Sequence, residues 1–174
     1  MRAAKAVRAS LVVFAALVFQ FCVLNALPVS GAHADVMLLL PVAAGYLLGP
    51  ARGATFGFVV GVITDLLLPT TFGMTALVGC VLGYLTGRAT SGLVRSSPWL
   101  PPLVFATATA AGLTGYAILG SVLDQSAPIG AYLPRALIVA VPVAAVLALP
   151  VLRAVAWALT AGRLPAAVGG PAKR

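Results

Sequence analysis

The sequence predicts an all-α fold: a polytopic membrane protein built as a single six-helix transmembrane bundle. Two observations lead to this prediction. Of the 174 residues, 61% are hydrophobic and only 8% are charged, whereas about a quarter of the residues of a soluble domain are charged. The apolar residues also form continuous runs, and a bilayer core of about 30 Å needs about 20 apolar residues per helix. Because these runs do not alternate with polar residues, a β-barrel is disfavoured.

The breaks between the apolar runs contain glycine, proline and serine, which mark turns. They place six spans at residues 9–28, 35–48, 52–68, 73–94, 99–123 and 133–152. We expect residues 1–163 to form one transmembrane domain, followed by a disordered cytoplasmic tail at residues 164–174. Residues 153–163 are expected to continue as an interfacial helix, with Trp157 at the level of the lipid headgroups.

Lysine and arginine predict the orientation of the spans. Ten of the 11 basic residues fall on one side of the six-span scheme, and only Arg135 falls on the other. Because cytoplasmic loops are enriched in Lys and Arg, both termini are expected in the cytoplasm. The net charge of +8 does not indicate nucleic-acid binding, since the basic residues are scattered singly and a nucleic-acid interface requires them on one face.

The first span allows a second interpretation, as a cleaved signal peptide. Three basic residues precede an apolar run that ends near Ala32-His33-Ala34, which has the form of a cleavage site. The run is long for a signal peptide, and it contains Gln20 and Asn25. These polar side chains suit a helix that is retained and hydrogen-bonds to its neighbours.

Small residues recur at a spacing of four in three of the spans, a pattern that lets helix backbones approach closely in lipid. The ridges are Gly53, Gly57 and Gly61 in the third span, Gly79, Gly83 and Gly87 in the fourth, and Ala136, Ala140, Ala144 and Ala148 in the sixth. Internal packing of the bundle explains such ridges. The alternatives are docking of a partner protein's single helix and the lining of a pore.

All three acids of the sequence lie at or near the outer ends of spans. Asp65 follows the third-span ridge and lies 13 residues after Arg52, a distance of about 20 Å along a helix. An acid near a helix C-terminus opposes the helix dipole and usually has a partner. Asp65 therefore either reaches headgroups or caps the next turn, or it pairs with Arg135 or a partner protein. Asp35 is predicted to be the N-cap of the second span.

The sequence lacks the residue sets on which membrane enzymes depend. One histidine and three isolated acids do not supply a metal site, a paired-acid protease site or an acidic cluster for phosphotransfer. The chain also has no phosphate-binding loop of the form G-x-x-x-x-G-K-[ST]. We therefore expect no catalytic, cofactor-binding or metal-binding residues.

Residues 34 to 87 contain a pattern that resembles a known family. Its elements are Asp35 at the start of the second span, the turn from Gly45-Tyr46 to Gly53-Ala54, the set Gly57, Phe58, Gly61 and Asp65, the start of the fourth span at Gly73 with Ala76-Leu77, and Gly83-Tyr84. This pattern resembles the bacterial rod shape-determining protein MreD family. Gln20 also matches a glutamine that is common in the family's first helix, while Ala34 stands where the family usually has proline.

The resemblance implies a non-enzymatic subunit of the cell-elongation machinery in the bacterial cytoplasmic membrane. Such a protein binds MreC, a periplasmic protein with a single membrane helix. It thereby helps couple MreB filaments to peptidoglycan synthesis by RodA and a penicillin-binding transpeptidase. On this hypothesis the surface of Gly57, Gly61 and Asp65, with Asp35, contributes to the partner-facing region or to the structure beside it.

The same resemblance supplies an alternative function. The family is similar in fold to the six-helix substrate-binding subunits of energy-coupling-factor vitamin transporters. A subunit of that kind needs an outward-opening pocket with aromatic and polar side chains. The candidates in the outer loops are His33, Phe72, Asp124 and Tyr132.

Overall fold

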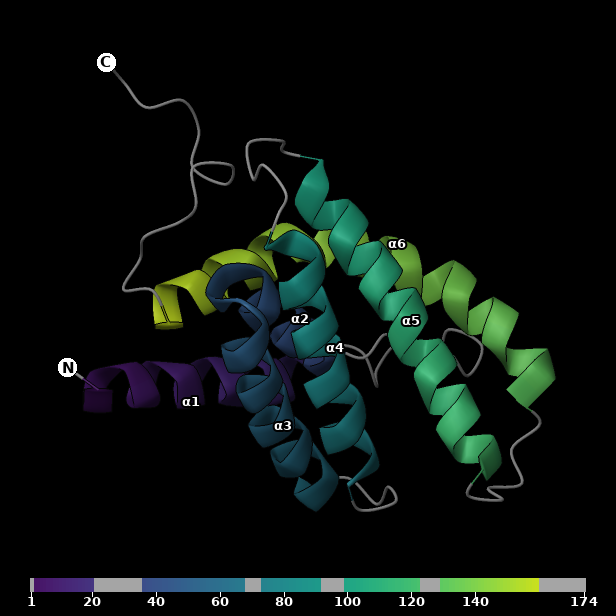
Figure 1. Ribbon diagram of the computed structural model, residues 1–174, viewed down its shortest axis with the longest axis horizontal. Coiled ribbons are helices and arrows are strands. Elements are labelled where there is room, and N and C mark those ends of the chain that lie inside the picture. Colours follow the sequence, from purple (N-terminus) through teal and green to yellow (C-terminus); the bar gives the residue numbers. More distant parts are fainter. Residues whose placement is uncertain (1, 21–35, 68–72, 92–98, 123–128, 160–174) are drawn as a thin grey trace.

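The computed structural model describes residues 2–20, 36–67, 73–91, 99–122 and 129–159, and these residues are helical apart from short turns. They form six helices and no strand (Figure 1): α1 (Arg2–Phe19), α2 (Val36–Leu48), α3 (Pro50–Leu67), α4 (Met74–Thr90), α5 (Leu100–Val122) and α6 (Ile129–Leu159). The predicted all-α class is confirmed for this part of the chain. Within it, three helices are long and apolar enough to cross a membrane, at Pro50–Leu67, Leu100–Ser121 and Ala136–Leu159.

The four middle helices begin and end close to the predicted spans, but α1 and α6 do not. Helix α1 already begins at Arg2, and residues 21–28 of the predicted first span lie outside the described residues. Helix α6 continues to Leu159 through three internal prolines. Proline removes a backbone hydrogen bond and kinks a helix, and in membrane helices the kink is often tolerated. The bend of α6 is visible in Figure 1.

Helix α2 lies at the centre of the packing. It contacts α3, α4 and α6, and every residue from 37 to 46 is buried. Its sequence has no charged residue, so no face is directed towards water. Small side chains at Ala43 and Ala44, both fully buried, let the neighbouring helices approach its backbone. The core is completed by Phe105 of α5 and Leu152 of α6, which are also fully buried.

Helices α1 and α6 meet near the C-terminal end of α6. The guanidinium carbon of Arg8 lies 5.3 Å from the centre of the Trp157 ring, within the range of a cation–π interaction. Val13 and Leu17 of α1 are buried and join the same apolar core. Figure 1 shows that α1 runs across the direction of α3 rather than alongside it. The flank between α1 and α3 is open, and residues of both helices line a groove there.

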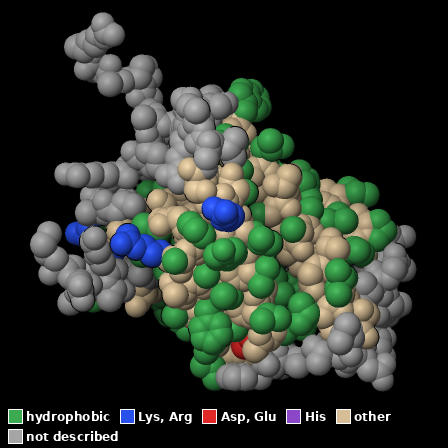
Figure 2. Space-filling view, viewed as in Figure 1, with side chains coloured by type: hydrophobic (Ala, Val, Ile, Leu, Met, Phe, Trp, Pro, Cys, Tyr) green, Lys and Arg blue, Asp and Glu red, His purple; other side chains and the backbone are tan. Residues whose placement is uncertain are grey.

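Basic and acidic side chains lie at opposite ends of the α3–α4 pair. Arg52 is in the first turn of α3 and Arg88 in the last turn of α4, whereas Asp65 is near the C-terminus of α3. Figure 2 shows basic side chains towards one end of the visible face and acidic atoms at the opposite edge. The described charges are therefore separated along the helix axes.

Two turns require glycine because of their backbone conformation. Gly49, between α2 and α3, has φ 88°, and Gly73, before α4, has φ 92°. A Cβ atom on either residue would meet nothing within 4 Å. Steric overlap with neighbouring helices therefore does not explain why these two positions need glycine. The left-handed conformation explains it, since it is unfavourable for residues with a Cβ atom.

We expect Gly49→Ala and Gly73→Ala each to lower the free energy of unfolding by about 1–2 kcal/mol, the usual cost of this conformation. Asparagine tolerates it better than alanine, so Gly73→Asn should be less destabilising. Gly115→Ala in α5 is the control, because it also meets nothing within 4 Å but has no positive φ. Thermal unfolding in detergent measures all four variants. If Gly73→Ala and Gly73→Asn lowered the free energy of unfolding equally, the left-handed conformation would not explain the need for glycine at this position.

Candidate functional site

The two glycine ridges predicted from the sequence face each other across α3 and α4, which run antiparallel. Gly53 lies opposite Gly83, Gly57 opposite Gly79, and Gly61 opposite Ala76. A Cβ atom on Gly53 would lie 2.6 Å from the carbonyl oxygen of Gly83, and a Cβ atom on Gly79 would lie 2.8 Å from that of Gly57. The two backbones are thus in direct contact, with no room for a side chain between them.

A third helix takes part in this contact through Gly45, to which the sequence analysis assigned no packing role. A Cβ atom on Gly45 would overlap the carbonyl group of Gly83, and one on Gly53 would lie 2.5 Å from the Cα of Gly45. Gly87 similarly meets the backbone of Gly49 and Pro50. We call this set the glycine seam: Gly45, Gly53, Gly57, Gly61, Gly79, Gly83 and Gly87.

The seam accounts for the spacing of four without a partner protein. The glycines of α3 and α4 that form the ridges are all buried, so they lie inside the bundle and not on its surface. Ala140, Ala144 and Ala148 of α6 are also buried. The sequence did contain a pattern that could have predicted the packing role of Gly45. Glycine recurs every four residues from this position, at Gly45, Gly49, Gly53, Gly57 and Gly61.

Asp65 closes the end of the seam by capping α4. Only 5% of its surface is exposed, and its carboxylate accepts backbone hydrogen bonds from Gly73 (2.9 Å), Thr75 (3.3 Å) and Ala76 (3.2 Å). The first N–H groups of a helix have no partner within the helix. The residue at the N-cap position is Gly73, which has no side chain to satisfy them.

The cap also explains why an anion is tolerated at the end of α3. The C-terminus of α3 disfavours a carboxylate, but the positive N-terminal end of α4 favours it. This geometry corresponds to one of the interpretations drawn from the sequence, in which Asp65 caps the next turn. Arg135, the other predicted partner, belongs to α6, but its side chain lies outside the described residues.

Of the remaining predicted site residues, Gln20 is among the described residues. Gln20 directly follows α1, far in the sequence from the seam. Asp35, the predicted N-cap of α2, immediately precedes the described start of that helix and lies outside the described residues. So do His33, Phe72 and Asp124 of the suggested vitamin pocket, and the side chain of Tyr132.

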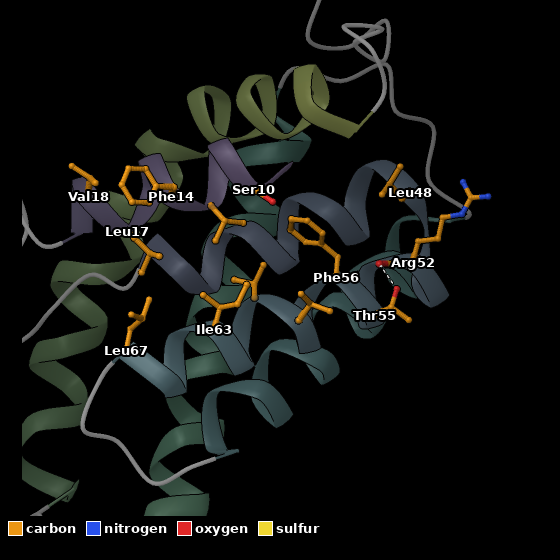
Figure 3. Close-up of a pocket in the computed structure, with 13 residues that line it drawn as sticks. Ser10, Phe14, Leu17, Val18, Leu48, Arg52, Thr55, Phe56, Ile63 and Leu67 are labelled. Atoms are coloured by element: carbon orange, nitrogen blue, oxygen red, sulfur yellow. Dashed lines mark hydrogen bonds between the residues drawn. The ribbon is translucent and has the colours of Figure 1, made fainter. Parts of the chain in front are cut away.

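A groove of about 970 Å³ lies on the flank between α1 and α3. Leu17 and Val18 of α1 line one wall, Val59 and Ile63 of α3 line the other, and Leu48 contributes from the end of α2. Figure 3 shows Leu17 of α1 and Ile63 of α3 on the two sides of this groove, and Leu48 beside Arg52 at its end. The sequence analysis missed the groove, because it is formed by helices that are distant in the chain.

The polar lining residues of the groove are few. Arg52 and Thr55 lie at one end and Leu67 lies towards the other, while Ser10 projects from α1 between them (Figure 3). The Thr55 hydroxyl donates to backbone carbonyls of its own helix, 3.2 Å from Ala51 and 3.0 Å from Arg52. The groove is therefore an apolar channel with a cation at one end.

The described residues contain no group of three or more His, Cys, Asp or Glu that could hold a metal ion. Within them, Cys80 is a free, partly buried thiol. Comparisons of the chain with protein-family profiles, curated proteins and solved structures find no match. The seam, the carboxylate cap and the groove are thus the features on which a function can be argued.

Proposed function

We propose that the chain crosses the bacterial cytoplasmic membrane six times, with both termini in the cytoplasm. Three helices of membrane-spanning length support this topology, and α2 and α4 pack on α3 as parts of one bundle. The separation of Arg52 and Arg88 from Asp65 along the α3–α4 pair agrees with an inner side rich in Arg.

In this membrane the protein acts as a non-enzymatic scaffold of the cell-elongation machinery, as the resemblance to the MreD family implies. It binds the membrane helix of MreC and, through it, helps couple MreB filaments to the RodA and transpeptidase pair. One observation supports this more than any other. Among the residues that carry the resemblance are Gly53, Gly57, Gly61, Asp65 and Gly73, and these five help to hold α3 and α4 together.

This observation matters because a chance match of glycines in apolar helices would have no reason to form a connected unit. Here Gly45, Gly53 and Gly83 of the motif contact one another, and the carboxylate of Asp65 accepts a hydrogen bond from the backbone N–H of Gly73, which begins the next part of the motif. A motif of this kind determines how the helices of the bundle pack, and it does not form the contact with the partner protein. The partner therefore binds to an outer face of the bundle. Two outer faces carry exposed apolar side chains: the α3–α4 face with Phe58 and Tyr84, and the α5–α6 face with Ile118 and Ile138.

Photo-crosslinking in the native host tests the proposal. A photoreactive amino acid replaces Phe58 or Tyr84 on the α3–α4 face, or Ile118 or Ile138 on the α5–α6 face. We expect one of the two faces to crosslink to a single-helix protein with a large periplasmic domain, and we expect depletion of the chain to make rod-shaped cells round. Absence of crosslinking from both faces, together with normal cell shape, would overturn the proposal. Stabilisation by a vitamin would instead identify a transport subunit.

A further inference from the structure

The α1/α3 groove has the dimensions of a ligand site. Its volume of about 970 Å³ lies at the upper end of the range for small-molecule sites, about 300–1,000 Å³. Large apolar side chains stand exposed along it, including Phe14 at 67% and Val59 at 54%. In a bilayer, such a channel accommodates flexible hydrocarbon chains.

The composition of the walls argues against a helix as the occupant. Helices associate in lipid through small residues that let the backbones approach, but the only small residues that line this groove are Ser10 and Thr55, and neither glycine nor alanine is among the lining residues. The glycines of α3 point instead into the seam. Bulky side chains such as Phe56 and Ile63 make the walls irregular, which suits acyl chains that adapt their shape better than a rigid helix.

Charge distinguishes the two ends of the groove. Among the described residues, the guanidinium of exposed Arg52 has no hydrogen-bond or ion-pair partner, and no acid lines the groove. The stem of Arg52 lines the groove while its charged end projects past it (Figure 3). Arginine at the level of the headgroups extends its charge to the interface, and its guanidinium binds phosphate oxygens in a bidentate manner.

We propose that the α1/α3 groove binds one anionic phospholipid, with its acyl chains between α1 and α3 and its phosphate on Arg52. The lipid would fill the flank that α1 leaves open and connect α1 to α3 through apolar contacts. This inference rests on the membrane location of the chain, and it is independent of the scaffold role. Val59 and Phe14 would contact the acyl chains, and Ser10 lies where it can meet the glycerol region.

Native mass spectrometry of the purified full chain in detergent tests the site, with added phosphatidylglycerol or phosphatidylcholine of identical acyl chains. We expect one phosphatidylglycerol to bind more tightly than phosphatidylcholine. Arg52→Gln should weaken phosphatidylglycerol binding by at least about tenfold, the effect of losing one charge-assisted hydrogen bond. Arg88→Gln is the matched control, since Arg88 is exposed at the same end of the α3–α4 pair but does not line the groove.

A second variant tests the place of the acyl chains without changing charge. Val59→Trp should fill the groove and reduce binding of both lipids, whereas Val81→Trp on the exposed face of α4 should not. Circular dichroism confirms that each variant is folded. Equal binding of phosphatidylglycerol to the wild type and Arg52→Gln would overturn the proposal. So would lipid binding that Val59→Trp leaves unchanged, or a dimer that forms through the groove without added lipid.

Discussion

Gly57→Ala is expected to lower the free energy of unfolding by about 1–3 kcal/mol, the usual cost of adding a methyl group to a filled interior. The added Cβ would overlap the carbonyl group of Gly79 and lie 3.0 Å from the Cβ of Pro41. Because its nearest obstacle is backbone, no side-chain rotation relieves the overlap, and α3 and α4 have to move apart. Gly57→Leu should prevent the two helices from packing.

The direction of this effect is diagnostic. In a helix interior alanine is normally more stable than glycine by about 0.5–1 kcal/mol. Gly115→Ala, which meets no atom within 4 Å, should therefore maintain or raise stability. Thermal unfolding in detergent separates the two variants, since 1 kcal/mol shifts the midpoint by roughly 2–4 °C in a chain of this size. A Gly57→Ala protein as stable as the wild type would show that the backbones of α3 and α4 are not in contact.

Asp65→Ala is expected to lower the free energy of unfolding by about 3 kcal/mol. It removes the acceptor of three backbone hydrogen bonds at the start of α4, and a hydrogen bond to a charged group contributes about 1.5–3 kcal/mol. Thr75 and Ala76 are buried, so the desolvation of their N–H groups would not be compensated. Asp65→Asn should be intermediate, because it keeps one acceptor oxygen but turns an amide N–H₂ towards backbone N–H groups.

Hydrogen exchange localises this effect to the cap. The amides of Gly73, Thr75 and Ala76 should exchange faster in Asp65→Ala than in the wild type. Thr64→Ala is the matched control, since Thr64 is the buried neighbour and its hydroxyl donates only within its own helix, to Val60 at 2.9 Å. Thr64→Ala should lower the free energy of unfolding by only about 1 kcal/mol. Unchanged protection at the start of α4 in Asp65→Ala would contradict the cap.

The predicted pair of Asp65 and Arg135 is tested by a double-mutant cycle. If the two side chains interact, Asp65→Ala and Arg135→Gln should show a coupling energy of about 0.5–3 kcal/mol. Additive losses would mean that Arg135 does not contribute to the effect of replacing Asp65. Both single variants and the double variant are measured by thermal unfolding in the same detergent.

The helix boundaries that the sequence predicted well include those marked by glycine and proline. Helices α2 and α3 meet at Gly49-Pro50, and α4 begins after Gly73, so turn chemistry marked these boundaries. The helical continuation expected after the sixth span is present, because α6 runs on to Leu159, but α6 begins four residues before the predicted span, at Ile129. The predicted span already contained Pro142 and Pro150, and both lie inside the helix, where proline bends the helix but does not end it.

The spacing of the glycines identified the packing residues but did not identify what they pack against. A ridge of small residues has the same pattern whether it faces a helix of the same chain or a partner. Only the fold pairs Gly57 with Gly79 and brings Gly45 of α2 into the seam. The role of Asp65 was left open for a related reason. Its acceptor oxygens bind backbone N–H groups, which every residue except proline has, so these partners leave no mark in the sequence.

The sequence by itself determined the all-α class, the membrane-like composition and the small residues on which α3 and α4 depend. These follow from local properties, because hydropathy, helix length and residue size are carried by each segment alone. The tertiary structure decided the rest: the closed glycine seam, the carboxylate of Asp65 on α4, and the groove between α1 and α3 with Arg52 at its end. Each of these three features is formed by residues of different helices. It therefore depends on how the folded helices cross, because the crossing determines which surfaces are in contact.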